Sequence, residues 1–375
     1  MTRRARRTIP PRRIATSAAA ATTAATAAAA HRWRVAALAL MCVGSVLWAI
    51  TAGTSAIGAG LAIRVLLSRV PVVSWLLPPL SHIEPGALEA AEVIVLDVRL
   101  PRIVLGLLVG AGLSVVGAAF QGLFRNPLAD PYIIGASSGA ALGATIGILM
   151  AGTALASPTW TIPVYAFIGS VATVAFVYAL ATIDGRVPTE TFLLAGVVVG
   201  SFVWAAVSFL MVIAGDDLPR VVMWLMGSLS AKSWSHVRIT APYVLLGTLA
   251  LVAMGRGLNL ISTGEEPARF MGLDTERFKT AVIVIGALVT AAVVASSGLI
   301  GFVGLVVPHI SRMLMGPDHR VLVPVSAAGG AAFMVVADTL ARTLIPPREI
   351  PVGIITAMTG APFFFYLLRT ARGRR

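Results

Sequence analysis

Long apolar runs recur along this chain of 375 residues, and they constrain its fold more than any other feature. Each run is about 20 residues long, enough for an α-helix to cross about 30 Å of hydrocarbon. Backbone groups in lipid must pair within their own segment, so these runs are expected to be helical. With 57% hydrophobic and 12% charged residues, the chain has more apolar surface than one aqueous core could bury. The sequence therefore predicts an all-α polytopic membrane protein and argues against a soluble helical one.

About ten membrane spans are predicted, separated by joints rich in charge, proline or glycine. The segment 58–98 carries several carboxylates and prolines and is interpreted as an outer loop with a short interfacial helix near 65–77. A tight joint at 296–298 separates the seventh span from the eighth. The predicted spans cover residues 35–57, 101–123, 131–152, 161–183, 191–214, 237–255, 279–297, 298–315, 322–345 and 351–369.

Both ends of the chain are basic, and they account for most of the net charge of +13. Residues 1–32 are predicted to be a disordered cytoplasmic tail, and residues 33–375 a single transmembrane domain. The paired arginines of the tail also suit an export signal, but the apolar stretch from Val35 lacks a small-residue cleavage site and opens a multispanning protein. Basic tails favour the cytoplasmic side and its anionic lipid, so both termini are predicted to be cytoplasmic and nucleic acid is not expected as a partner.

The sequence offers little for metal or thiol chemistry. The single cysteine, Cys42, lies in the first apolar run and is interpreted as a small packing residue. No histidines are spaced as a ligand pair on one helix face, so no metal site is predicted. The five histidines are His31, His82, His236, His309 and His319.

A transporter needs an energy source, and this sequence contains no phosphate-binding loop. The chain has two lysines, Lys232 and Lys279, and the segment 227–233 lacks the glycine that precedes the lysine in such a loop. Ion-coupled carriers place carboxylates inside the membrane, and here Asp338 is the one candidate. Arg342 follows one turn later, so a local ion pair is the alternative interpretation of Asp338. An energy-supplying partner on another polypeptide is the economical conclusion.

Three stretches of the chain, spread over about residues 90–370, together resemble the FecCD-type permeases of ABC importers, which take up ferric siderophores, haem and cobalamin. The order and spacing of the motifs also fit that family. The stretches are Arg99-Leu-Pro-Arg102 with Gln121 to Pro131 and Gly135 to Gly143; Gly264 to Leu273; and Gly301 to His309 with Asp318-His-Arg320, Ala337 to Arg342 and Glu349 to Pro362.

The resemblance implies an ABC importer type II permease fold of ten helices in the cytoplasmic membrane. It also implies partners: a second copy forming a homodimer, two cytoplasmic ATP-binding subunits and an extracytoplasmic substrate-binding protein. ATP and magnesium would then belong to the partner ATPase, and no cofactor or catalytic residue is expected in this chain. ATP would rock the helices between inward- and outward-facing states.

The resemblance also assigns roles to particular residues. Arg99, Arg102 and Arg342 match positions that meet acidic residues of the binding protein, a task suited to the planar guanidinium fork. Snorkelling anchors at the membrane interface are the alternative. Asn126, Leu128 and Thr189 resemble the cytoplasmic gate, for which a plain Asn-Pro turn is the alternative.

The charged inner segment 259–279 is the predicted coupling element to the ATPase. Two glycines bracket a short helix in it, whose acidic start suits a helix N-terminus and whose end exposes an apolar knob. The residues concerned are Gly264, Glu265, Glu266, Ala268, Arg269, Phe270 and Gly272.

Three functions therefore stay open at this stage. The first is an importer permease for an iron chelate, a ferric siderophore or haem, with cobalamin as the alternative cargo of the same family. The second is an ion-coupled secondary carrier that uses Asp338. The third is a membrane receptor that transports nothing.

Overall fold

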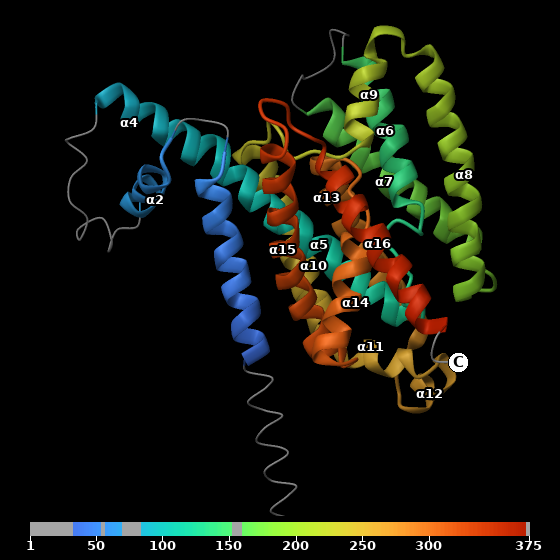
Figure 1. The fold of residues 1–375 in the computed structure, drawn as a ribbon. Coiled ribbons are helices and arrows are strands. Elements are labelled where there is room, and N and C mark those ends of the chain that lie inside the picture. Colours follow the sequence, from blue (N-terminus) through green and yellow to red (C-terminus); the bar gives the residue numbers. More distant parts are fainter. Residues whose placement is uncertain (1–32, 54–56, 70–83, 152–159, 373–375) are drawn as a thin grey trace, which may run out of the picture.

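The computed structural model describes residues 33–53, 57–69, 84–151 and 160–372. Within these residues the fold is all-helical, apart from one isolated bridge between Ile183 and Arg186. Each predicted span coincides with a long helix (Figure 1). These helices are Trp33–Thr51, α5 (Leu100–Leu123), α6 (Ala136–Met150), α7 (Thr161–Ala181), α8 (Thr189–Ile213), α10 (Trp234–Ala253), α13 (Thr275–Ser297), α14 (Val303–Met315), α15 (His319–Thr343) and α16 (Val352–Arg372).

Seven helical stretches in the described residues are long and apolar enough to cross a membrane. Helices α6 and α14 are shorter, with 15 and 13 residues. The joint predicted at 296–298 lies later in the chain: α13 continues to Ser297, Gly298 has a φ of 70°, and α14 begins only at Val303. The eighth span is thus shorter than predicted.

Two ends of the bundle carry the short helices. One end holds α2 (Ala59–Ser68), α4 (Pro85–Glu92) and α9 (Leu218–Leu225), the last preceded by the single turn η2 (Gly215–Asp217). The other end holds α11 (Gly255–Ser262) and α12 (Glu265–Phe270). The start of the helix Trp33–Thr51 and the end of α16 lie at this second end too (Figure 1).

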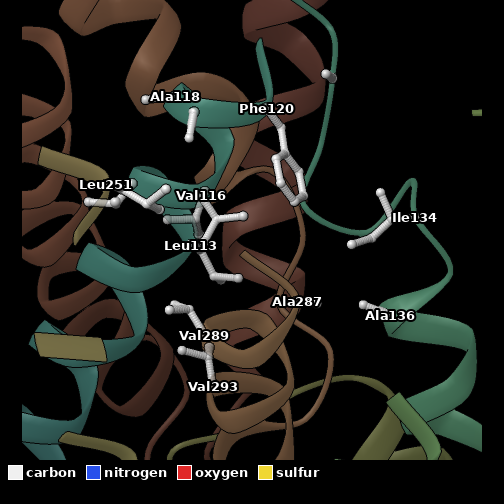
Figure 2. Close-up of a cluster of buried hydrophobic side chains, with 14 of the residues drawn as sticks. Leu113, Val116, Ala118, Phe120, Ile134, Ala136, Leu251, Ala287, Val289 and Val293 are labelled. Carbon is white, nitrogen blue, oxygen red and sulfur yellow. The ribbon is translucent and has the colours of Figure 1, made fainter. Parts of the chain in front are cut away.

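Helix α5 lies at the centre of the bundle. Most of its side chains are buried, and helices α10, α13, α14 and α15 surround it. Figure 2 shows Leu113 of α5 close to Val289 and Val293 of α13, with Val116 and Phe120 further along α5. Because the outer helices must face lipid, their exposed apolar side chains need no further partner.

Small residues bring α6 and α7 into backbone contact. A Cβ atom at Gly143 would meet the carbonyl oxygen of Tyr165, and one at Gly139 would meet that of Gly169. These two helices can approach so closely only because glycine carries no side chain. Residues 135–143 therefore include a packing face of small residues.

The predicted outer loop at 58–98 is wrong from Pro85 onward. Helix α4, the π-helical stretch η1 (Val93–Arg99) and α5 form one helical run of 39 residues. Proline cannot donate the helical hydrogen bond and crowds the preceding turn, and Pro101 lies two residues after the end of the π-helical stretch. The carboxylates that suggested a loop, such as Asp97, lie on the exposed side of this run.

The interfacial helix predicted near 65–77 is only partly tested. Helix α2 ends at Ser68, earlier than predicted, and residues 70–83 lie outside the described part of the chain. The predicted tail 1–32 also lies outside it. Cys42 is half-buried, and its thiol contacts the carbonyl oxygen of Ala328 on α15 at 3.2 Å, as a packing residue would.

Candidate functional site: a projecting helix and an arginine cluster at opposite ends

Helix α12 projects from the end of the bundle between two glycines. Gly264 and Gly272 have φ values of 128° and 87°, which residues other than glycine rarely adopt. Between them the side chain of Ala268 is fully buried, which seats the helix on the bundle. Phe270 is 91% exposed and Met271 63% exposed, so the far end of the helix carries an apolar knob.

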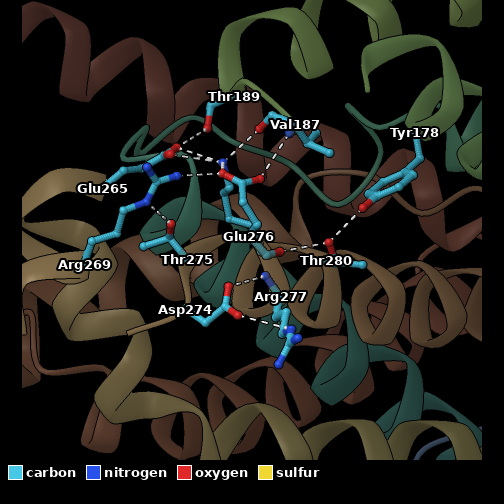
Figure 3. Close-up of polar contacts among 11 residues, drawn as sticks. Tyr178, Val187, Thr189, Glu265, Arg269, Asp274, Thr275, Glu276, Arg277 and Thr280 are labelled. Atoms are coloured by element: carbon cyan, nitrogen blue, oxygen red, sulfur yellow. Dashed lines mark hydrogen bonds and ion pairs between the residues drawn. The ribbon is translucent and has the colours of Figure 1, made fainter. Parts of the chain in front are cut away.

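A buried lysine anchors this helix to α13. Lys279 is 3% exposed, and its ammonium lies 3.0 Å from a carboxylate oxygen of Glu265 on α12. It also lies 3.0 Å from Glu276, one turn earlier on α13. A third bond, 2.9 Å long, goes to the carbonyl oxygen of Val187 in the α7–α8 connection. The buried ammonium of Lys279, with its two carboxylate partners, therefore joins α12, α13 and the α7–α8 connection (Figure 3).

Further bonds close this network, which we call the Lys279 network. Arg269 of α12 donates to the hydroxyl of Thr275 at 2.8 Å and to Glu276 at 3.1 Å. The backbone N–H of Val187 donates to Glu276 at 3.1 Å. Since both termini of α12 are tied to α13, the helix is expected to move with α13 rather than independently.

The predicted gate residues lie at this same end, but Thr189 does not bond to Asn126 or Leu128. Asn126 accepts from the backbone N–H of Leu128 at 2.9 Å, the local turn that was the alternative interpretation. Leu128 is 51% exposed. The hydroxyl of Thr189 lies 3.4 Å from Glu265, so the start of α8 contacts the Lys279 network instead of Asn126. The gate itself stays a prediction.

The three arginines predicted to dock the binding protein lie at the opposite end of the bundle, and all are buried. Arg102 on α5 forms a fork with both carboxylate oxygens of Asp338 on α15, with bonds of 2.9 to 3.2 Å. The same guanidinium donates to Glu349 at 3.0 Å. Arg102 thus holds α5, α15 and the segment before α16 together.

The predicted ion pair between Asp338 and Arg342 does not form. Both side chains are on α15 one turn apart, but the carboxylate turns toward Arg102, which offers a bidentate geometry. Arg342 instead donates to the carbonyl oxygen of Ala49. The interpretation of Asp338 as an ion-paired residue is correct, but its partner is Arg102 and not Arg342.

Two of the arginines meet the end of the first helix. Arg99 donates to the carbonyl oxygen of Ile50 at 2.6 Å, next to the carbonyl that Arg342 contacts. Cations at a helix C-terminus satisfy its unpaired carbonyls and its dipole. The exposed fractions of Arg99, Arg102 and Arg342 are 5%, 8% and 6%. Docking by these side chains stays a prediction, and it would require them to leave these internal partners.

The match to known proteins agrees with this arrangement. Residues 38–370 match the model of the FecCD transport family. The chain belongs to this family. It is 46% identical over 321 residues to the cobalamin import system permease protein BtuC of Halobacterium salinarum, covering 84% of this chain and 85% of that one. It is 41% identical to the hemin transport system permease protein HmuU of Yersinia pestis, over 75% of this chain and 84% of that one.

A solved structure shares the fold of this FecCD chain. It is described as a metal-chelate type ABC transporter in an inward-facing conformation, with 32% sequence identity and a TM-score of 0.76. The similarity covers 89% of this chain and 98% of the other.

Sequence reasoning missed two partners in these sites. Glu349 was part of a motif, yet its bond to Arg102 links residues 247 positions apart, which no local pattern signals. Lys279 ends the predicted coupling segment, and no partner is predicted for it. A lysine at the start of an apolar span, in a chain with two lysines, was the available signal for the Lys279 network.

Proposed function

We propose that this chain is the membrane-spanning permease subunit of an ATP-driven importer of an iron chelate. It works as a homodimer, with two ATP-hydrolysing subunits at the α12 end and a substrate-binding protein at the arginine-cluster end. The α12 end is then cytoplasmic, which places both chain termini in the cytoplasm. ATP and magnesium are held by the partner ATPase, and the permease supplies no catalytic group.

The observation that carries this proposal is the exposed knob on an anchored helix. Phe270 is 91% exposed on a helix that is held in place by the burial of Ala268 and by the Lys279 network. A large aromatic side chain held in water costs free energy unless a partner covers it. Because the Lys279 network ties α12 to α13 and to the α7–α8 connection, a force applied at Phe270 would be transmitted to α13 and α8. Such a rigid link suits the transmission of an ATPase movement.

The proposed cargo is a ferric siderophore or haem, as in the hemin permease relative. Cobalamin is the second candidate, and the 46% identity to a cobalamin permease favours it. A different class, the ion-coupled carrier, loses support because the Asp338 carboxylate is paired with Arg102 rather than left for ions or protons.

The proposal predicts that the knob recruits the ATPase. Phe270→Asp should leave the permease in the membrane but lower co-purification of the partner ATPase by about tenfold or more, because a charge cannot enter an apolar groove. Pull-down from detergent extracts with the tagged permease measures this.

Phe176→Ala is the matched control, since Phe176 is a 60% exposed aromatic residue on α7. It should leave co-purification unchanged. Full recovery of the ATPase with Phe270→Asp would contradict the proposed role of α12.

A further inference from the structure

A cavity of about 320 Å³ opens at the end of the bundle opposite α12. It lies between α9, the segment 226–233 that precedes α10, and the end of α13. One wall is apolar and includes Trp224. The remaining lining carries cations and hydroxyl groups: Arg220, Ser228, Ser230, Lys232 and Ser297.

Lys232 is the unusual member of this lining. Its counterpart Lys279 has two carboxylate partners, whereas in the described part of the chain no ion pair or hydrogen bond engages the Lys232 ammonium. Burial lowers the pKa of Lys232 to about 8, so the group is still mostly protonated at neutral pH. A partly buried cation without a counter-ion is unfavourable, and an anion entering the cavity would relieve that cost.

The surroundings of Lys232 are fixed rather than adaptable. The backbone N–H of Ser228 donates to the carbonyl oxygen of Ser297 at 2.8 Å, which ties the segment to the end of α13. A Cβ atom at Gly298 would meet the carbonyl oxygen of Trp224, so α9 lies directly against that end. A rigid lining suits a site that recognises a group without first having to order itself.

Arg220 adds a second cation at the edge of the cavity. It is half exposed and is held by Asp217 at 2.8 Å, so most of its charge is balanced. The net positive charge of the lining therefore comes from Lys232. Hydroxyl donors and one partly buried cation are groups that bind carboxylate or phosphate oxygens.

We propose that this cavity receives an oxyanion of the imported chelate, a carboxylate or a phosphate, with Lys232 as its counter-ion. The inference rests on the proposed function and specifies the substrate class of the importer. Ferric citrate and haem carry carboxylates, and cobalamin carries a phosphodiester. A neutral ferric hydroxamate has no such group and should gain nothing from Lys232.

Direct binding to the full chain tests this without any ATPase. The purified chain in lipid nanodiscs is dialysed against labelled ferric citrate, haemin or cyanocobalamin, with empty nanodiscs as the blank. At least one probe should bind wild type, and Lys232→Gln should weaken that binding by about tenfold or more through the lost charge-assisted bond. Lys232→Arg, which keeps the charge, should restore most of it.

Arg238→Gln is the matched control, because Arg238 is an exposed cation one turn into α10 that does not line this cavity. It should bind like wild type. If no probe binds wild type, or if Lys232→Gln binds as well as wild type, the inference is overturned. ATP-driven uptake by the assembled importer is measured separately, so a failure of the proposed function is distinguished from a failure of this site.

Discussion

The guanidinium of Arg102 faces two carboxylates from distant parts of the chain inside the bundle. Asp338 is only 3% exposed, so removal of its partner leaves a carboxylate in a poorly hydrated place. Arg102→Gln should therefore destabilise the permease by about 3 kcal/mol, the cost of breaking a buried pair from one side. The midpoint of thermal unfolding of the purified chain, measured without any binding protein, checks this.

Arg348→Gln is the control for this prediction, since Arg348 is an exposed arginine next to Glu349. Its unfolding free energy should change by less than about 0.5 kcal/mol. If Arg102→Gln kept the thermal midpoint of wild type and lost only the capture of the binding protein, Arg102 would be a docking residue and the structural role would be wrong.

Lys279 is expected to contribute both to the stability of the fold and to the coupling of ATP turnover to uptake. Lys279→Met leaves Glu265 and Glu276 facing each other without the cation between them. We expect a loss of about 3 kcal/mol and release of α12 from α13, so that the ATPase still binds but its ATP turnover no longer drives uptake. The ratio of transported chelate to hydrolysed ATP measures the release.

The neighbouring Arg277 supplies the comparison for Lys279. Its ion pair with Asp274 is on the surface, and the side chain is 91% exposed. Arg277→Gln should thus change stability by about 0.5 kcal/mol or less and keep the transport ratio. Equal effects of the two substitutions would mean that burial of Lys279 has no special role.

At the scale of elements, the contact between α6 and α7 depends on missing side chains. Gly143→Ala should push the helices apart and cost about 1–3 kcal/mol, because the new methyl group meets backbone that cannot rotate away. Gly200→Ala on α8 should be neutral or stabilising, since the nearest atom to its Cβ is 3.6 Å away. Thermal unfolding of both variants is the measurement, and equal midpoints would contradict the packing argument.

Some elements of the fold could be predicted from the sequence, and others could not. The spans followed from apolar length, and the bracket of α12 followed from Gly264 and Gly272, whose positive φ values are a local property. The helical run through α4 was missed because its carboxylates suggested a loop, although they lie on one exposed side. The partners of Arg102 were out of reach, because they depend on how α5 and α15 pack.

At the scale of the whole molecule, the two ends of the bundle have different chemistry. One end carries α12 with its exposed apolar knob, and the other carries the arginine cluster and the cavity with Lys232. The central helix α5 runs between them, with Arg102 near its start and the predicted gate residue Asn126 just past its end. A central helix of this kind would let movement at the α12 end alter the opposite end of the chain.

Uptake by the assembled importer shows whether this permease transports a chelate with energy from ATP. The permease, its ATPase and its binding protein are reconstituted in liposomes, and accumulation of ferric citrate, haemin and cyanocobalamin is followed with and without ATP. One chelate should accumulate, and its accumulation should require ATP and all three proteins. Accumulation driven by a proton or sodium gradient, without the ATPase, would contradict it.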